Sequence, residues 1–250
     1  MVVEDYRLTH QHPLKGRSYE ESFTKFPYRR IVWEWEQDVL KGVMSDLFEE
    51  KSRLMYLDFA CGTGRILRLL EGFMKESYGV DVSKSMLDVA EENVLSSSLI
   101  LGDLTKEDLF PEKYFDLITA FRFFLNAQQD LRENVLRVLG KNIKNNGFLI
   151  INIHMNKGCL LEKELRLYQA IKGEKTEKPN SLSFIETKHL LSSFNFEVVQ
   201  TFHYGVIPIY QEEYKFLIKT VDRMERLFSR IPSLMQLSRY IIYVCSFKQK

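Results

Sequence analysis

The sequence predicts an α/β fold with a doubly wound, mostly parallel sheet of seven strands and additional helical lid segments. Three observations predict this fold. Short apolar runs alternate with helical patterns between residues 54 and 153, which is typical of repeated strand–helix–strand units. The turn Gly62-Thr63-Gly64 directly follows the first of these runs. The last apolar run, Tyr240–Phe247, has no long crossover helix beside it, so we expect an antiparallel last strand.

Each element follows from local pattern. The predicted strands are the apolar runs Leu54–Ala60, Tyr78–Val82, Ser98–Leu101, Phe115–Phe121, Phe148–Ile153, Phe196–His203 and Tyr240–Phe247. The predicted helices run from Gly64 through Leu70, from the cap Ser83 to about Val94, over Leu131–Ile143 and over Thr187–Ser193. Asn145-Asn146-Gly147 is expected to be a turn before the fifth strand.

The remaining segments are expected to cover the site rather than to extend the sheet. We expect residues 1–50 to form an N-terminal helical lid, because apolar positions from Tyr28 to Phe48 recur at helical spacing. Residues 51–250 then form one domain with cover insertions at about 155–185 and 205–237. Ligands of such folds bind at the carboxyl edge of the sheet, and we expect the covers to lie there.

Composition excludes several classes of protein. The chain has 35 basic and 34 acidic residues and a net charge of +1, so no global field attracts nucleic acid. The three cysteines, Cys61, Cys159 and Cys245, are far apart and form neither a disulfide framework nor a zinc pattern. No signal-type segment and no run of about 18 apolar residues is present. We therefore expect a soluble, cytoplasmic protein without a metal site.

The glycine turn limits the choice of cofactor. Gly62 and Gly64 lie where a strand meets a helix, and a dinucleotide fingerprint would need a third glycine where Leu67 stands. A phosphate-binding P-loop would need Gly-Lys-Ser/Thr, and Arg65 follows Gly64 instead. The carboxylate of Asp58 would repel a pyrophosphate but suits a cationic ammonium.

Two further acids follow the next strands. Asp81 ends the second strand, about twenty residues after the turn, where a carboxylate can accept both ribose hydroxyls. Asp103 follows Gly102 at the end of the third strand, where it can accept a hydrogen bond from an adenine amino group. Together with Asp58, these acids fit an adenosine that carries an amino-acid tail and no phosphates.

With these motifs the sequence resembles the class I S-adenosylmethionine-dependent methyltransferases of the small-molecule or glycan type (methyltransferase-11/25-like), which have a Rossmann-like fold. The resemblance covers about Leu54 to His154, in the pieces LDFACGTGR, YGVDVSKSML, LILGDLTKEDL, FDLITAFRFFLN and NNGFLIINIH. It implies S-adenosylmethionine as cofactor and S-adenosylhomocysteine as product. It also implies a cofactor site formed by Asp58, Ala60, Gly62, Gly64, Asp81, Val82, Met86, Gly102, Asp103, Leu104 and Phe121. Ala60 and Cys61 depart from the commonest all-glycine spacing of the family.

In this family an N-terminal tyrosine or arginine often contacts the methionine carboxylate of the cofactor. Tyr19 and Tyr28, together with Arg29 and Arg30, are the candidates for such a contact in this chain. All four stay open as candidates.

The acceptor is predicted to be a hydroxyl or amine of a small molecule or glycan. DNA and RNA amino-methyltransferases of this fold carry a proline motif after the fourth strand, and Thr119–Phe124 contains no proline. His154 ends the fifth strand and can act as a base near neutral pH, while Arg122 and Asn126 can orient the acceptor. The alternatives are a structural strand-end histidine and a surface ion pair. His203 and Tyr204 are secondary candidates.

One segment has a character of its own. Residues 214–231 combine basic residues at intervals of three or four with an apolar side. We interpret them as a lid helix with a solvated basic face, and contact with an anionic membrane surface is the alternative.

Three other functions stay open at this point: a nucleotide-cofactor (NAD-type) oxidoreductase, a non-catalytic S-adenosylmethionine-binding module and a protein methyltransferase. The sequence does not give the oligomeric state.

Overall fold

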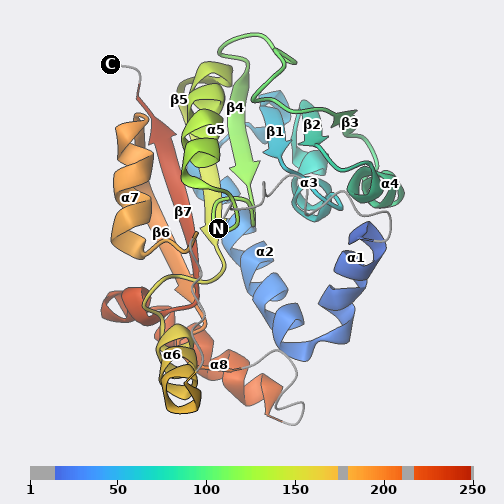
Figure 1. The fold of residues 1–250 in the computed structure, drawn as a ribbon. Helices are drawn as coiled ribbons and strands as arrows, with labels where there is room; N and C mark the ends of the chain where they lie inside the picture. The colour runs from blue at the N-terminus through green and yellow to red at the C-terminus, as the bar shows by residue number, and fades with distance from the viewer. Residues whose placement is uncertain (1–14, 174–179, 210–216, 249–250) are drawn as a thin grey trace.

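The structure is a computed structural model that describes residues 15–173, 180–209 and 217–248. Seven strands form one sheet in the order β3-β2-β1-β4-β5-β7-β6 (Figure 1). Their bounds are β1 Met55–Phe59, β2 Glu76–Asp81, β3 Ser98–Leu101, β4 Phe115–Ala120, β5 Ile143–Ile153, β6 Phe196–Tyr204 and β7 Tyr240–Phe247. The first five strands are parallel, and β7 is antiparallel to both of its neighbours, β5 and β6. The predicted fold class, including the antiparallel last strand, is confirmed.

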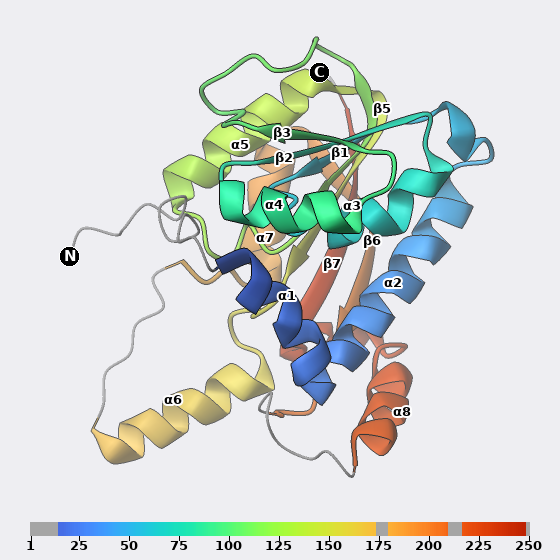
Figure 2. The same ribbon diagram turned by 90° about the vertical axis from the view of Figure 1, so that its right-hand side faces the viewer.

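Helices cover both faces of the sheet (Figure 2). On one face, α5 (Gln129–Asn142) and α7 (Phe184–Ser193) pack apolar side chains against the strands. On the other face, α2 (Pro27–Leu47) and α3 (Arg65–Leu70) form a second core with β1, β4, β5 and β7. The edge strand β3 and its neighbour β2 are contacted by α4 (Lys84–Asn93), which follows the predicted cap Ser83. Coverage on both faces explains why β1 is buried along its whole length.

The N-terminal helices are part of this packing. α2 begins at Pro27, a residue favoured in the first helical turn, and the predicted helix of this segment is confirmed. Its Trp35 stacks on Tyr204 of β6 with ring centroids 5.2 Å apart. α1 (Lys15–Lys25) packs against α2 and α4 (Figure 2). The N-terminal segment therefore covers a sheet face through α2, and α1 continues it toward the end of β2.

The predicted turn at Asn145-Asn146-Gly147 is wrong as a separate element. β5 runs through it, and the pairing with β4 moves from Phe115↔Ile143 to Leu117↔Phe148. An advance of two residues along β4 therefore corresponds to an advance of five residues along β5. The extra residues of β5 form a bulge, in which Asn146 has a φ of +63°. A bulge of this kind keeps the strand continuous while it consumes turn-forming residues.

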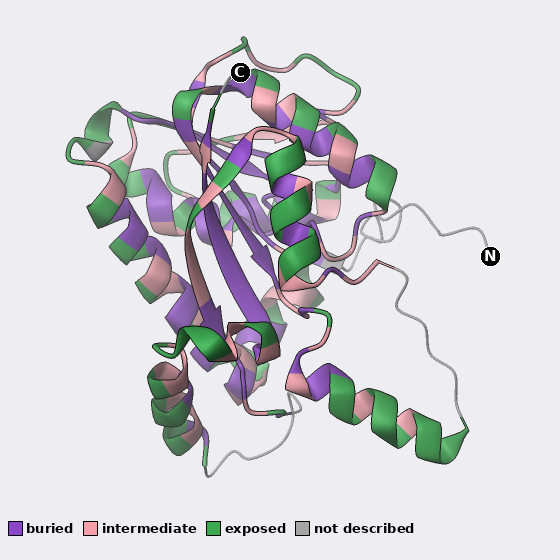
Figure 3. Cartoon of the chain, turned by 90° about the vertical axis from the view of Figure 1, so that its left-hand side faces the viewer, coloured by how far each residue is buried: buried purple, intermediate pink, exposed green. Residues whose placement is uncertain are grey.

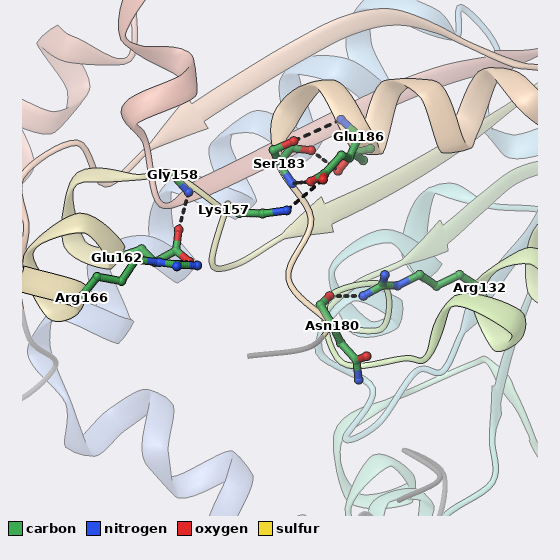
Figure 4. A network of polar contacts seen from close by, with 9 residues as sticks. Arg132, Lys157, Gly158, Glu162, Arg166, Asn180, Ser183 and Glu186 are labelled. Carbon is green, nitrogen blue, oxygen red and sulfur yellow. Dashed lines mark hydrogen bonds and ion pairs between the residues drawn. The ribbon is translucent and has the colours of Figure 1, made fainter. Parts of the chain in front are cut away.

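Within the first cover segment the structure contains α6 (Leu160–Lys172), of which only Leu161 and Glu162 are buried. Figure 3 shows this helix projecting from the body with most of its residues exposed. Its base is tied to α7 by an ion pair of 2.9 Å from Lys157 to Glu186 (Figure 4). Ser183 and Glu186 also form a reciprocal cap at the start of α7.

Within the second cover segment the structure contains α8 (Ile218–Phe228) and the 3-10 helix η4 (Pro232–Leu237). The buried Glu225 carboxylate accepts the backbone N–H groups of Gly205, Val206 and Ile207 at 2.7–2.9 Å, which fixes α8 to the end of β6. Arg226 pairs with Asp38 of α2 at 2.8 Å. Lys215 of the predicted basic face lies outside the described residues. The division of the chain into a lid and a domain with covers stays a prediction.

Among the described residues, no helix combines the length and the apolar character needed to cross a bilayer.

Candidate functional site

A cavity of about 280 Å³ lies at the carboxyl ends of the five parallel strands, β1 to β5. This is the edge at which ligands bind in doubly wound sheets. The residues around the cavity come from the glycine turn, from the ends of these strands and from α1 and α2. They include Tyr19, Arg29, Asp58, Ala60, Cys61, Gly62, Thr63, Arg65, Asp81, Val82, Met86, Gly102, Asp103, Leu104, Phe121, Arg122, Phe123, Asn126 and His154.

The glycine turn leaves open space above its backbone. Gly62 has a φ of +55°, a conformation that favours glycine. A Cβ built at Gly62 would meet no atom within 4 Å. Gly64 also has a positive φ, but a Cβ there would come within 3.0 Å of Val94. Gly62 therefore opens toward the cavity, whereas Gly64 allows α3 to pack closely on α4.

The carboxylate of Asp81 holds this turn in place. Its Oδ2 accepts the backbone N–H of Gly62 and its Oδ1 that of Ser83, both at 2.8 Å. Burial raises the pKa of Asp81, and these N–H groups oppose the rise. A carboxylate has about four lone pairs, so two accepted bonds leave capacity for a ligand.

Asp58 is almost completely buried, with 1% of its surface exposed. Its Oδ1 accepts the hydroxyl of Thr119 at 2.6 Å. Its Oδ2 has no hydrogen-bond partner among the residues that the structure describes. Burial raises the pKa of Asp58 to about 7, although the Thr119 bond partly opposes the shift. A cationic donor at Oδ2 would offset this desolvation.

At the end of β3, Asp103 is held in position by Thr105. Its Oδ1 accepts the backbone N–H of Thr105 at 3.0 Å and the hydroxyl of the same residue at 2.6 Å. Leu104, Val82 and Met86 line the cavity beside it. This part of the cavity combines apolar walls with one fixed acceptor.

Arg122 follows β4 with a φ of +61°. Its Nη2 lies 3.3 Å from the carboxylate of Glu36 on α2, and Glu36 is 1% exposed. Asn152 bridges the two residues, since its Oδ1 accepts the Arg122 backbone N–H at 2.6 Å and its Nδ2 donates to Glu36 at 3.0 Å. Burial disfavours the charged guanidinium, but the carboxylate of Glu36 outweighs it and raises the pKa of Arg122. Arg122 is therefore a fixed cation.

Two other residues that are predicted to act on the acceptor also line the cavity. Asn126 donates from Nδ2 to the carbonyl of Arg122 at 3.0 Å, and its own carbonyl accepts Asn180 at 3.1 Å. His154 comes directly after β5 and lines the cavity. The three residues predicted to act on the acceptor, His154, Arg122 and Asn126, thus lie around one cavity.

The structure separates several predicted residues from the cavity. Tyr28 is buried against Tyr240, with ring centroids 6.4 Å apart, and does not line it. Gly64 does not line it either. His203 is buried and forms a hydrogen bond of 2.7 Å with Ser238. Tyr204 donates its hydroxyl to Asp222 at 2.8 Å. The other predicted cofactor-binding residues lie at the cavity wall.

Sequence reasoning assigned no role to several residues that line the cavity. The most informative of them is Arg65. Because Arg65 directly follows the glycine turn in the sequence, its place at the cavity could have been predicted. Thr63 of the same turn and Phe123 after β4 also line the cavity.

Comparison with known proteins agrees with this geometry. Residues 57–151 match the family model described as "Methyltransferase domain". A demethylmenaquinone methyltransferase of Thermotoga maritima is 35% identical over 97 residues, which are 38% of this chain and 41% of that protein. The chain thus spans about two fifths of the length of this curated relative.

Solved structures show the same fold over nearly the whole chain. Magnesium protoporphyrin IX methyltransferase of Synechocystis, with bound S-adenosylhomocysteine, has a TM-score of 0.65 at 11% identity. That comparison covers 98% of this chain and 100% of the other. An S-adenosylmethionine-dependent methyltransferase of Thermotoga maritima has a TM-score of 0.61 at 16% identity, and the coverage is 93% and 95%.

Proposed function

We propose that this chain, whose residues 57–151 form a class I S-adenosylmethionine-dependent methyltransferase domain, methylates a hydroxyl or amine of a small molecule or glycan. The observation that carries the proposal is the order of the acids. Asp58 and Asp81 lie at the carboxyl ends of β1 and β2, and Asp103 lies just after β3. These three strands are neighbours, and the three acids line one cavity with the open turn at Gly62.

The cavity fits the cofactor group by group. Asp58 Oδ2, buried and without a hydrogen-bond partner in the described residues, would accept the ammonium of the methionine end. Asp81 would accept the ribose hydroxyls with its remaining lone pairs, and Asp103 would accept the adenine amino group. Gly62 has the open space that a close ligand needs.

Bound S-adenosylmethionine would supply an electrophilic methyl group, carried on a positively charged sulfur, to a lone pair of the acceptor. The chain then has three tasks: to align the acceptor, to exclude water and to remove a proton where the acceptor requires it. Arg122, fixed by Glu36, and Asn126, fixed by two hydrogen bonds, orient the acceptor. His154 takes up the acceptor proton on its imidazole.

Ligand binding tests the cofactor. S-adenosylhomocysteine is expected to raise the melting temperature of the protein, whereas NAD leaves it unchanged. Stabilisation by NAD alone would favour the oxidoreductase alternative. A methyl-transfer screen with sugars, phenols, amines and peptides then distinguishes a small-molecule or glycan enzyme from a protein methyltransferase. Cofactor binding without turnover of any acceptor class would favour a non-catalytic module.

A variant tests the base. His154→Ala is expected to lower kcat by roughly 100-fold or more, because general bases contribute about that much, with the affinity for S-adenosylhomocysteine kept. His189→Ala, at an exposed position of α7, is the matched control and should retain wild-type kcat. Near-full turnover of His154→Ala would contradict the base role.

A further inference from the structure

We propose that residues 217–231, which comprise α8 and its two flanks, dock on an anionic lipid surface. The inference concerns the outside of the molecule and does not depend on the proposed methyltransferase function. It starts from apolar side chains that the fold leaves exposed.

Exposed apolar side chains are concentrated in two short parts of the chain. Twelve large apolar side chains are exposed among the residues that the structure describes. Seven of them lie on α6 or between 217 and 231, namely Leu167, Tyr168, Ile171, Leu217, Met224, Leu227 and Ile231. Single exposed apolar residues are ordinary, whereas grouped ones indicate an interaction surface.

The inner face of α8 is fixed to the body of the protein. Ile218 and Glu225 are buried, and Glu225 accepts the three backbone N–H groups that follow β6. Asp222 accepts the hydroxyl of Tyr204 at 2.8 Å and pairs with Arg226 at 3.0 Å. Both acids of the helix are thus used within the protein.

The outer face of α8 carries an apolar stripe. Met224 and Leu227 lie three residues apart on the helix, while Leu217 and Ile231 flank its two ends. Successive members of this set are seven, three and four residues apart, which places side chains on one side of a helix. Each is between 40% and 59% exposed. The apolar sector of α8 is therefore wider than the part that its contact with the body buries.

Basic residues border this stripe. Lys219, Arg223 and Arg230 are exposed, and they form no ion pair among the described residues, unlike Arg226, which pairs with acids of α2 and α8. No acidic residue follows α8 in the chain. The acids at 212–213, before the helix, lie outside the described residues. Between 217 and 231, the outer face thus has three positive charges and no negative one.

The bases and the stripe together identify the partner. A solvated lid helix accounts for the bases but not for the stripe. A lipid surface presents anionic headgroups directly above acyl chains, so it meets both features at once. A symmetric contact with a second copy would bring the same bases together without acids between them, and a nucleic acid would leave the stripe without a partner. An anionic lipid surface therefore fits the whole face.

α6 lies at the same end of the molecule. Figures 1 and 2 both show α6 and α8 beyond the end of the sheet toward which the parallel strands run. α6 exposes Leu167, Tyr168 and Ile171, and the ammonium of Lys172 lies 4.6 Å from the centroid of the Tyr168 ring. Such amphipathic side chains are favoured between headgroups and acyl chains. The cavity lies at the same edge of the sheet, so docking would turn this edge toward the lipid.

Co-sedimentation with vesicles tests the proposal. The protein is expected to bind vesicles made of equal parts of phosphatidylglycerol and phosphatidylcholine. Vesicles of phosphatidylcholine alone should bind at least about tenfold more weakly. Added salt should weaken the binding, because exposed charges are screened. Equal binding to both kinds of vesicle, or binding to neither, would overturn the proposal.

Two variants test the bases and the stripe separately. The triple variant Lys219→Gln/Arg223→Gln/Arg230→Gln is expected to weaken binding to the anionic vesicles by roughly 100-fold, because three bases near a lipid surface act together. The double variant Met224→Gln/Leu227→Gln should weaken it by at least about tenfold, because it removes apolar surface that the lipid would bury. Both variants change exposed side chains, so their melting temperatures without vesicles should equal that of the wild type.

A control variant removes the same charge at the opposite edge of the sheet. Arg53 and Lys75 precede β1 and β2, and Lys248 follows the antiparallel strand β7. All three side chains are exposed. The triple variant Arg53→Gln/Lys75→Gln/Lys248→Gln should bind anionic vesicles as the wild type does.

Three outcomes would contradict the assignment of this face to lipid. Unchanged vesicle binding in both α8 variants would exclude the face, and an equal loss in the control would reduce the effect to net charge. A dimer of the wild type that dissociates in Met224→Gln/Leu227→Gln, without vesicle binding, would assign the face to a second copy. Vesicle binding is measured without cofactor, so its failure would leave the proposed methyltransferase function untouched.

Discussion

The carboxylate of Asp81 accepts the backbone N–H of Gly62 at 2.8 Å, so the end of β2 fixes the turn that follows β1. One side chain therefore serves two purposes, since the proposed ribose acceptor also holds the glycine turn in shape.

The variant Asp81→Asn is expected to lose both the support of the glycine turn and the proposed contact with the ribose. An asparagine presents an amide donor where one of two backbone N–H groups needs an acceptor, so we expect a loss of about 1–3 kcal/mol of stability. The affinity for S-adenosylhomocysteine should fall by at least about tenfold. Thermal unfolding and calorimetric titration measure the two effects. The control variant Asp88→Asn, which alters an exposed pair with Lys84, should change neither the stability nor the affinity. If Asp81→Asn binds more weakly but is as stable as the wild type, Asp81 does not support the turn.

The pKa of Asp58 predicts a pH-dependent stability. Its value of about 7 in the folded protein lies above the ordinary 3.8, so ionisation is harder in the folded than in the unfolded chain. Ionised Asp58 therefore lowers the free energy of unfolding. This loss of stability is absent below about pH 4, grows as the pH rises to about 7 and is constant above that, with an upper limit of about 4 kcal/mol. Asp58→Asn should therefore melt higher than the wild type at pH 8, and the difference should shrink toward pH 4. A constant difference would contradict the raised pKa.

The same group predicts the pH dependence of cofactor binding. An ammonium pairs with the ionised form of Asp58, so the affinity of the wild type for S-adenosylhomocysteine should rise as the pH increases from about 5 to 8. Asp58→Asn should bind more weakly, without this rise. Calorimetric titration at several pH values measures both, and a parallel pH dependence in the variant would assign it to another residue.

Gly62→Ala separates ligand contact from backbone strain. An added methyl group would stand in open space but at a φ of +55°, so we expect a strain of about 1–2 kcal/mol. Gly173, at the end of α6, has a φ of +72° and equally open space outside the cavity. Both alanine variants should lose similar stability, but only Gly62→Ala should lose affinity for S-adenosylhomocysteine, by about tenfold or more. Equal affinities would mean that no ligand approaches Gly62.

Glu36→Gln should strongly destabilise the fold. The substitution leaves the guanidinium of Arg122 without its carboxylate at a site where Glu36 is 1% exposed. Breaking a buried ion pair costs about 3–5 kcal/mol. Glu34→Gln on the same helix removes an exposed partner of Arg30 and should cost less than about 1 kcal/mol. Denaturant unfolding measures both, and similar small losses would show that Arg122 is hydrated.

The sheet could be predicted because its strands are short apolar runs with turn or helix signals between them. Two features escaped this reasoning. The triplet Asn145-Asn146-Gly147 has turn chemistry, but pairing with β4 on one side keeps it inside β5 as a bulge. The second feature is α6, which buries only two residues. Its apolar residues Leu161, Leu165 and Tyr168 do recur at helical spacing, but the segment around them is polar in composition.

The acids of the proposed cofactor site could be placed at one cavity from the sequence, because they stand at the ends of consecutive strands. Three arginines of the cavity wall, Arg29, Arg65 and Arg122, could not be placed together in this way, because they are far apart in the chain. Only the packing of α1 brings them around Phe23.

The cavity is lined by residues of the family segment and of both its flanks. The segment 57–151 that matches the family contains Asp58, Asp81 and Asp103. Tyr19, Arg29 and His154 lie outside it. Arg122 and Asn126, which we propose orient the acceptor, also lie within 57–151, so grafting the α1–α2 segment onto a related domain should exchange Tyr19 and Arg29 and leave these two residues in place. A change of acceptor in such a fold would therefore draw on substitutions in the family segment as well as in its flanks.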